Sequence, residues 1–141
     1  MKAFIGIVLF LVVSGAIAQE QAPQLADRAT LEQAFDGAMT CSALTAIRAS
    51  RSPASEAWLW ENRSFAFGML GARFWYSATE NALPAAELDK MLNKYADRID
   101  EMPPEQIEPF ELGCEAKYAD IDKLCEENSC PNTGPPAEQN P

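Results

Sequence analysis

Hydrophobic and polar residues follow helical spacing over most of this chain. The clearest stretch lies between residues 84 and 102, where the leucines, the methionines, Tyr95 and Ile99 share one side of a helical wheel. The charged residues of this stretch face the other side, as in a helix on the surface of a helical domain. No stretch shows the period of two residues that a strand of useful length requires. The sequence therefore predicts an all-α fold.

The expected helices are bounded by capping residues and prolines. Thr30 and Gln33 match a capping box ahead of the first helix. Ser52 is the expected N-cap of the second helix, with Pro53 as its first residue. Four helices are predicted, over about 31–49, about 53–79, about 84–102, and from a start between 104 and 109 to about 127.

The second predicted helix contains the stretch FAFGMLGARFWY, from Phe65 to Tyr76, and is apolar on two opposite faces. Such a helix is usually buried between neighbours. Its uncharged run, Phe65 to Ala72, is far shorter than the roughly 20 residues that a membrane span needs. We therefore expect a small bundle of four helices packed around this aromatic-rich central helix.

The first 18 residues are set apart from the fold. They begin with Lys2, continue with an apolar run to Val13, and end in the small-residue pattern Ala16-Ile17-Ala18. This layout is typical of a secretory signal peptide, and the apolar run is too short for a membrane anchor. We expect cleavage after Ala18, no membrane insertion afterwards, and export to a bacterial periplasm or, failing that, to the outside of the cell.

The remaining chain divides into three parts by composition. Residues 19–29 are polar and without periodicity, and we expect a flexible lead-in. Residues 30–130 form a single helical domain, a size that suits one core. Residues 131–141 are rich in proline and lack large apolar side chains, so we expect a disordered tail.

The four cysteines, Cys41, Cys114, Cys125 and Cys130, predict two disulfides in an exported protein. On one continuous helix Cys114 and Cys125 would lie about 16 Å apart, whereas a disulfide needs Cα atoms within about 7 Å. The favoured pairing is Cys41–Cys114 with Cys125–Cys130, because the second bond closes a short loop after a helix. Cys41–Cys125 with Cys114–Cys130 stays open as an alternative.

The charge of the chain is unevenly distributed. Residues 19–78 carry 6 acidic and 5 basic residues, whereas residues 79–141 carry 15 acidic and 5 basic residues. Such a chain repels nucleic acid and anionic membranes, so we expect neither as a partner. A cationic protein is the partner that the charge favours, and the pattern does not specify an oligomeric state.

One run of carboxylates is the candidate face for such a partner: Glu105, Glu108, Glu111, Glu115 and Asp122. The run lacks the spacing and the central glycine of a calcium-binding loop, so it does not predict a metal site. An ordinary solvated surface is the other interpretation.

Five residues of the second predicted helix are candidates for the lining of an apolar cavity: Trp58, Phe65, Gly68, Gly71 and Trp75. Glycines beside aromatic rings leave room for a ligand, although ordinary core packing explains the same pattern. Arg63 and Arg73 lie on this helix too, and we expect them to snorkel or to pair with carboxylates of the later helices.

The chain offers few residues for catalysis. It has no histidine, which is the commonest general base and metal ligand, and no CxxC motif. We expect no cofactor, no metal and no enzymatic activity. The leading hypothesis is an exported, non-catalytic protein-binding module of inhibitor, immunity or chaperone type, with an acidic C-terminal half. The alternatives are a carrier of a small apolar ligand beside residues 53–79 and a small carboxylate-based enzyme.

Overall fold

The structure is a computed structural model and describes residues 27–131. The expected signal peptide, most of the expected lead-in and residues 132–141 of the expected tail lie outside this range. Within it the chain is all-helical and contains no strand, as the sequence predicted. The helices are α1 (Arg28–Arg51), α2 (Ala54–Thr79), α3 (Ala85–Asp100), α4 (Pro104–Glu115) and α5 (Tyr118–Asn128).

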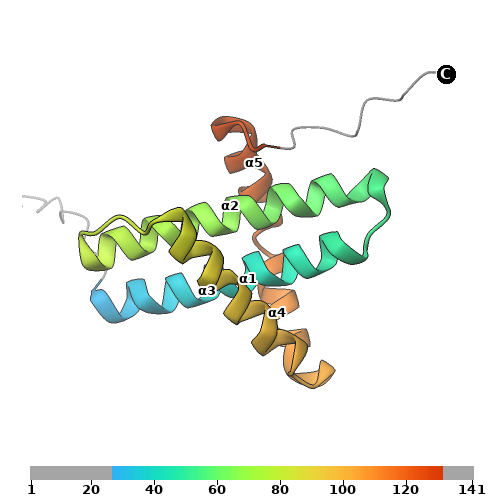
Figure 1. The fold of residues 1–141 in the computed structure, drawn as a ribbon, viewed down its shortest axis with the longest axis horizontal. Coiled ribbons are helices and arrows are strands. Elements are labelled where there is room, and N and C mark those ends of the chain that lie inside the picture. Colours follow the sequence, from blue (N-terminus) through green and yellow to red (C-terminus); the bar gives the residue numbers. More distant parts are fainter. Residues whose placement is uncertain (1–26, 132–141) are drawn as a thin grey trace, which may run out of the picture.

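Helices α1 and α2 run antiparallel and form the middle layer of the fold (Figure 1). Helix α3 crosses one side of this pair and packs mainly on α1. On the opposite side α4 packs on α1, and α5 packs on α2. The main apolar cluster lies between α2 and the α4–α5 segment, and its buried members are Ala66, Phe67, Cys114, Ile121, Cys125 and Cys130.

The contact between α1 and α2 is made by small side chains. The buried residues of α1 include three alanines, Ser42 and Thr45, and those of α2 include Gly68 and Gly71. A Cβ atom at Gly71 would lie 3.1 Å from Sδ of Met39, which is completely buried. A larger residue at this position would require the Met39 side chain to shift, so glycine suits the close approach of the two helices.

The close contact changes the place of the aromatic residues. The sequence predicted that α2 would be enclosed by its neighbours, but the buried positions of α2 are Asn62, four small residues and Phe67. Phe65 and Tyr76 remain 42% and 57% exposed. Large rings do not fit between helices that are this close, so most of them lie at the edges of the interface.

The C-terminal part of the described chain contains two helices where the sequence predicted one. Helix α4 ends at Glu115, and α5 begins at Tyr118 after a turn in which the amide of Lys117 donates to the carbonyl of Cys114 over 2.9 Å. The break lets α4 lie against α1 while α5 lies against α2. The fold thus has five helices in its described part.

The helix starts also differ from the expected capping residues. Helix α1 begins before Thr30, because the carboxylate of Asp27 accepts the amide of Thr30 over 2.8 Å and acts as the N-cap. This hydrogen bond lowers the pKa of Asp27 below its ordinary value. Ser52 does not cap α2; it ends α1, and its hydroxyl donates to the carbonyl of Arg48 over 2.8 Å. Pro53 occupies the N-cap position of α2 without a side-chain cap.

The structure joins Cys41 to Cys114 and Cys125 to Cys130, which is the favoured pairing. The first bond ties α4 to α1 across 73 residues of sequence, and the second joins the last turn of α5 to Cys130, at a sequence separation of 5. The distance argument from one continuous helix does not apply, since the chain turns between Cys114 and Cys125. None of the helices in residues 27–131 is long and apolar enough to span a membrane.

The two disulfides are expected to differ in their effect on stability. Replacing Cys41 and Cys114 by alanine should lower the free energy of unfolding by about 4 kcal/mol, because the bond closes a long loop. The matched pair, Cys125→Ala with Cys130→Ala, should lower it by about 2 kcal/mol. Urea unfolding of both variants measures the difference. If removing Cys125–Cys130 lowered the free energy of unfolding as much or more, Cys41–Cys114 would not be the disulfide that contributes more to stability.

Candidate functional site

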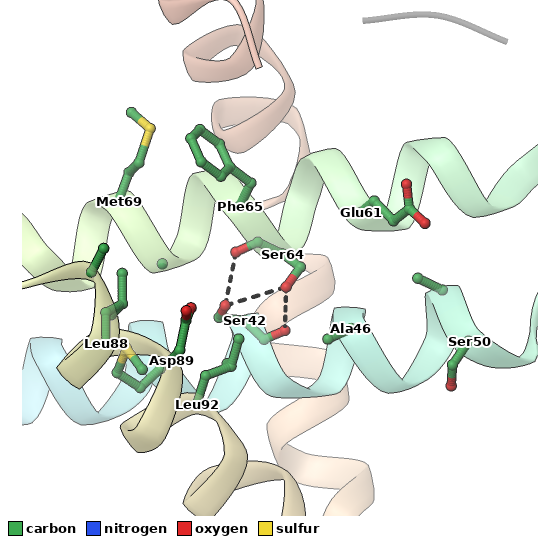
Figure 2. Close-up of a pocket in the computed structure, with 14 residues that line it drawn as sticks. Ser42, Ala46, Ser50, Glu61, Ser64, Phe65, Met69, Leu88, Asp89 and Leu92 are labelled. Atoms are coloured by element: carbon green, nitrogen blue, oxygen red, sulfur yellow. Dashed lines mark hydrogen bonds between the residues drawn. The ribbon is translucent and has the colours of Figure 1, made fainter. Parts of the chain in front are cut away.

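A groove of about 520 Å³ opens on the side of the α1–α2 pair that α3 crosses, and we call it the front groove (Figure 2). Phe65 and Met69 project from α2 at one edge, and Leu88 and Leu92 come from α3. Ser42 and Ser64 lie between the two longer helices at its floor. Its volume and apolar walls are in the range of small-molecule sites.

The two serines of the floor hold α1 and α2 together. The hydroxyl of Ser42 donates to the carbonyl of Ser64 over 2.8 Å, and the hydroxyl of Ser64 donates to the carbonyl of Ser42 over 2.9 Å. Both residues are buried, and no buried side-chain nitrogen or oxygen in the described part of the chain lacks a partner. These hydroxyls are therefore used for helix packing, and we call the pair the serine clasp.

The five cavity candidates of the sequence are only partly brought together. Phe65 and Gly68 line the front groove. Gly71 lies at the α1–α2 contact, and Trp75 packs on Phe35 with ring centroids 5.5 Å apart. Nε1 of Trp58 donates to the carbonyl at position 55, in the first turn of α2, over 2.9 Å.

A second groove of about 570 Å³ opens on the opposite side of the α1–α2 pair, and we call it the rear groove. Helices α1, α2, α4 and α5 all contribute to its lining. Its walls are largely apolar, with Phe67 and Phe74 from α2, Phe110 from α4 and Ile121 from α5. Phe110 stays 43% exposed. The sequence did not single out this groove, because its lining comes from four separated segments.

The five carboxylates of the predicted acidic face do not share one surface role. Asp122 belongs to α5 and is bound by Arg63, and Glu115 forms an ion pair with Arg48 over 3.6 Å. Glu115 and the three remaining carboxylates belong to α4, a helix that has four acidic residues and no basic residue. Three of them form no ion pair within residues 27–131: Glu105, Glu108 and Glu111. No group of acidic or cysteine side chains in this range is arranged to hold a metal ion.

A cluster of arginines and aromatic rings connects the segments around the rear side. Nε and Nη2 of Arg63 donate to the two carboxylate oxygens of Asp122 over 2.8 and 2.7 Å. The guanidinium lies 4.2 Å from the ring centre of Tyr118 and 4.9 Å from that of Trp60. The bond with Asp122 raises the pKa of Arg63, and burial raises the pKa of Tyr118. Arg48 lies over the same Trp60 ring, 4.6 Å from its centre.

This pairing was expected for Arg63 only in general terms. A cation on an otherwise apolar helix indicates a carboxylate partner, but Asp122 is 59 residues away in the sequence. The rings that lie beneath the guanidinium depend on the packing of α5 against α2, which no local pattern predicts. Arg73 is exposed on the same helix.

Helix α3 is attached by a smaller polar contact. The hydroxyl of Tyr95 donates to Oδ1 of Asp36 over 2.6 Å, and Arg98 approaches the same atom at 3.7 Å. Burial and this hydrogen bond raise the pKa of Tyr95. The shifted pKa values in the described residues thus belong to contacts within or between helices and not to an acid and base facing a groove.

Comparison of the chain with protein-family models, curated proteins and solved structures gives no significant match. Its function therefore has to be inferred from its own residues and their geometry.

Arg63 is expected to stabilise the fold far more than its neighbour Arg73. Arg63→Ala should lower the free energy of unfolding by about 2–3 kcal/mol, because Asp122 loses two charge-assisted hydrogen bonds and the Tyr118 ring loses its cation, whereas Trp60 keeps Arg48. Arg63→Lys should recover less than half of this, since lysine lacks the planar fork. Arg73→Ala is the matched control and should change the value by less than about 0.5 kcal/mol. Equal losses from the two alanine variants in urea unfolding would contradict the cluster.

The close approach of α1 and α2 is tested at the serine clasp. Ser42→Leu should lower the free energy of unfolding by about 3 kcal/mol, because it overfills the interface and removes a buried hydrogen bond. Ser50→Leu, at an exposed position of the same helix, is the matched control and should have an effect below about 0.5 kcal/mol. Thermal or urea unfolding measures both. A tolerated leucine at Ser42 would mean that the helices do not require small residues there.

Proposed function

We propose that this chain is an exported, non-catalytic binding protein of inhibitor, immunity or chaperone type, whose acidic C-terminal half meets a cationic protein. The observation that carries the proposal is the character of α4. This helix has four carboxylates and no basic residue, and it also presents Phe110 and Leu112 at 43% and 61% exposure. Large apolar side chains beside unpaired charge of one sign are typical of a surface that meets a partner.

The placement of the other charges supports α4 as the centre of this surface. Most ion pairs in residues 27–131 use carboxylates of α1, α3 or α5, and α4 contributes Glu115 alone. The electrostatic potential of Glu105 and Glu108 is therefore not offset by a paired cation on their own helix. A positively charged partner would be attracted to this helix over distances of about 8–10 Å at ordinary salt concentrations.

Export is supported by two features. The first 18 residues have the layout of a signal peptide, and we propose that they are cleaved, which would place the mature chain in a periplasm or outside the cell. The two disulfides are compatible with such an oxidising compartment. A non-catalytic role is supported by the use of the buried hydroxyls and of the groups with shifted pKa in packing contacts.

A second candidate function is the carriage of a small apolar ligand in the front groove. The observation that favours it is the joint presence of Phe65 and Gly68 in the lining of a groove of about 520 Å³. Leu88 and Leu92 of α3 would then cover one side of the ligand.

The proposed function is tested on protein purified gently from the export compartment of its own host. Native mass spectrometry should show an added protein mass, and the affinity of that partner should fall as the salt concentration rises. A complex that is insensitive to salt would contradict the electrostatic proposal. A retained small molecule would instead support the carrier, provided that Leu92→Gln, which places a polar amide in the front groove, abolishes its retention.

The role of α4 is tested by removing its charge. Glu105→Gln with Glu108→Gln should lower the affinity for the cationic partner about three- to tenfold, because two unpaired carboxylates are lost. Asp97→Asn with Glu101→Gln changes the total charge equally at exposed positions outside α4 and is the matched control. Titration calorimetry at low ionic strength measures both variants. Equal losses would mean that the total charge, and not α4, attracts the partner.

A further inference from the structure

The four glycines of residues 27–131 fall into two kinds. A Cβ atom at Gly71 would lie 3.1 Å from Met39 of α1, so Gly71 favours the close packing of α1 and α2, and a Cβ atom at Gly68 would make an ordinary contact with Ser42 at 3.5 Å. A Cβ atom at Gly37 or Gly113 would meet nothing within 4 Å. All four are helical and none has a positive φ angle.

The second kind is not explained by the packing of this chain. Glycine weakens the interior of a helix relative to alanine, because its backbone loses more freedom on folding. At Gly37 and Gly113 neither a tight neighbour nor a special backbone angle requires it. Both residues line the rear groove, Gly37 from α1 and Gly113 from α4. Both positions are exposed, and the absence of side chains there leaves this part of the groove open.

The walls of the rear groove suit a large apolar side chain. Phe67, Leu70, Phe74, Phe110 and Ile121 supply apolar surface from three helices. The volume of about 570 Å³ exceeds what one aromatic side chain fills. An apolar anchor in a pocket, surrounded by polar contacts, is how protein partners gain most of their affinity.

The charge of the residues near the rear groove indicates which kind of partner it can bind. The same helix that supplies Phe110 and Gly113 to the groove carries Glu105 and Glu108 as unpaired carboxylates. Asp120 lies in the lining as well, beside one cation, Lys117. The chain has a net charge of −10, which opposes a second copy and an anionic lipid surface as occupants.

We propose that the rear groove receives a large apolar side chain from a segment of the cationic partner, with lysines or arginines of that segment on either side meeting α4. This rests on the proposed function and deepens it, because it names the site and the chemistry of the bound segment. Gly37 and Gly113 leave room for the anchor.

The test fills the groove without changing its charge. Gly113→Leu and Gly37→Leu place a side chain in the open space, and Ala86→Leu adds a leucine at an exposed position of α3 as the matched control. The probe is a short synthetic helix with lysines on one face and leucines on the other. One twin peptide has alanine for leucine, and a second has glutamine for lysine. Titration calorimetry of the full mature chain measures binding, and thermal unfolding confirms that each variant is folded.

The proposal expects binding of the first peptide that weakens with salt and falls about tenfold or more in Gly113→Leu or Gly37→Leu, with no change in Ala86→Leu. Both glycine variants should unfold at or above the wild-type temperature, since leucine is the better helix former. The alanine twin should bind about tenfold more weakly than the leucine peptide, as the anchor is lost.

Other outcomes would contradict this proposal, and they distinguish its failure from a failure of the proposed function. If binding depended on salt but did not change in the leucine variants, the cationic partner would be supported and the groove would not be its binding site. If the glutamine twin bound as tightly as the lysine peptide, the groove would still be an apolar binding site, but the partner would not need to be cationic. A third outcome is that no peptide binds the wild-type chain but one binds a chain that lacks residues 19–26. This result would identify the N-terminal segment of the chain itself as the occupant of the groove. A dimer that dissociates in Gly113→Leu would identify a second copy.

Discussion

Helices α1 and α2 lie close together because the residues between them are small, and the other three helices take their positions from that pair. Gly71 accepts the side chain of Met39, and Ser42 and Ser64 exchange hydrogen bonds across the contact. Helix α3 is attached to one side through Asp36 and Tyr95. The Cys41–Cys114 disulfide and the Arg63–Asp122 pair attach α4 and α5 to the other. A change that separated α1 from α2 would therefore displace every other element.

The same contact explains why the protein has grooves on two sides. Small residues occupy the centre of the α1–α2 layer, and several large side chains of α2 lie at its edges, where Phe65 and Tyr76 remain exposed while Phe67 is buried. Phe65 stands at the front groove, and Phe67 and Phe74 stand at the rear groove. The rear groove combines apolar walls with the most acidic helix of the described chain, which is why we propose it as the binding site of a cationic partner.

Much of the fold could be read from the sequence, since helical periodicity and prolines are local signals. The all-α class and the disulfide pairing are confirmed. The sequence did not predict the break after Glu115 because no proline or left-handed residue marks it, and the N-cap Asp27 precedes the capping-box pattern of Thr30 and Gln33. The site was harder to predict, since the rear groove depends on contacts between segments far apart in sequence. The difference between Gly37 and Gly71 is likewise visible only once neighbouring helices are in place.

We propose that Gly37 and Gly113 mark the binding site and that Gly68 and Gly71 do not. Nuclear magnetic resonance of the isotope-labelled mature chain tests this directly, because glycine amides give a separate and readily assigned group of signals. On titration with the lysine–leucine peptide, the amides of Gly37 and Gly113 should shift, whereas that of Gly68, at the front groove, should stay in place. Shifts at Gly68 without shifts at Gly37 and Gly113 would place the partner on the opposite side of the molecule and contradict the account.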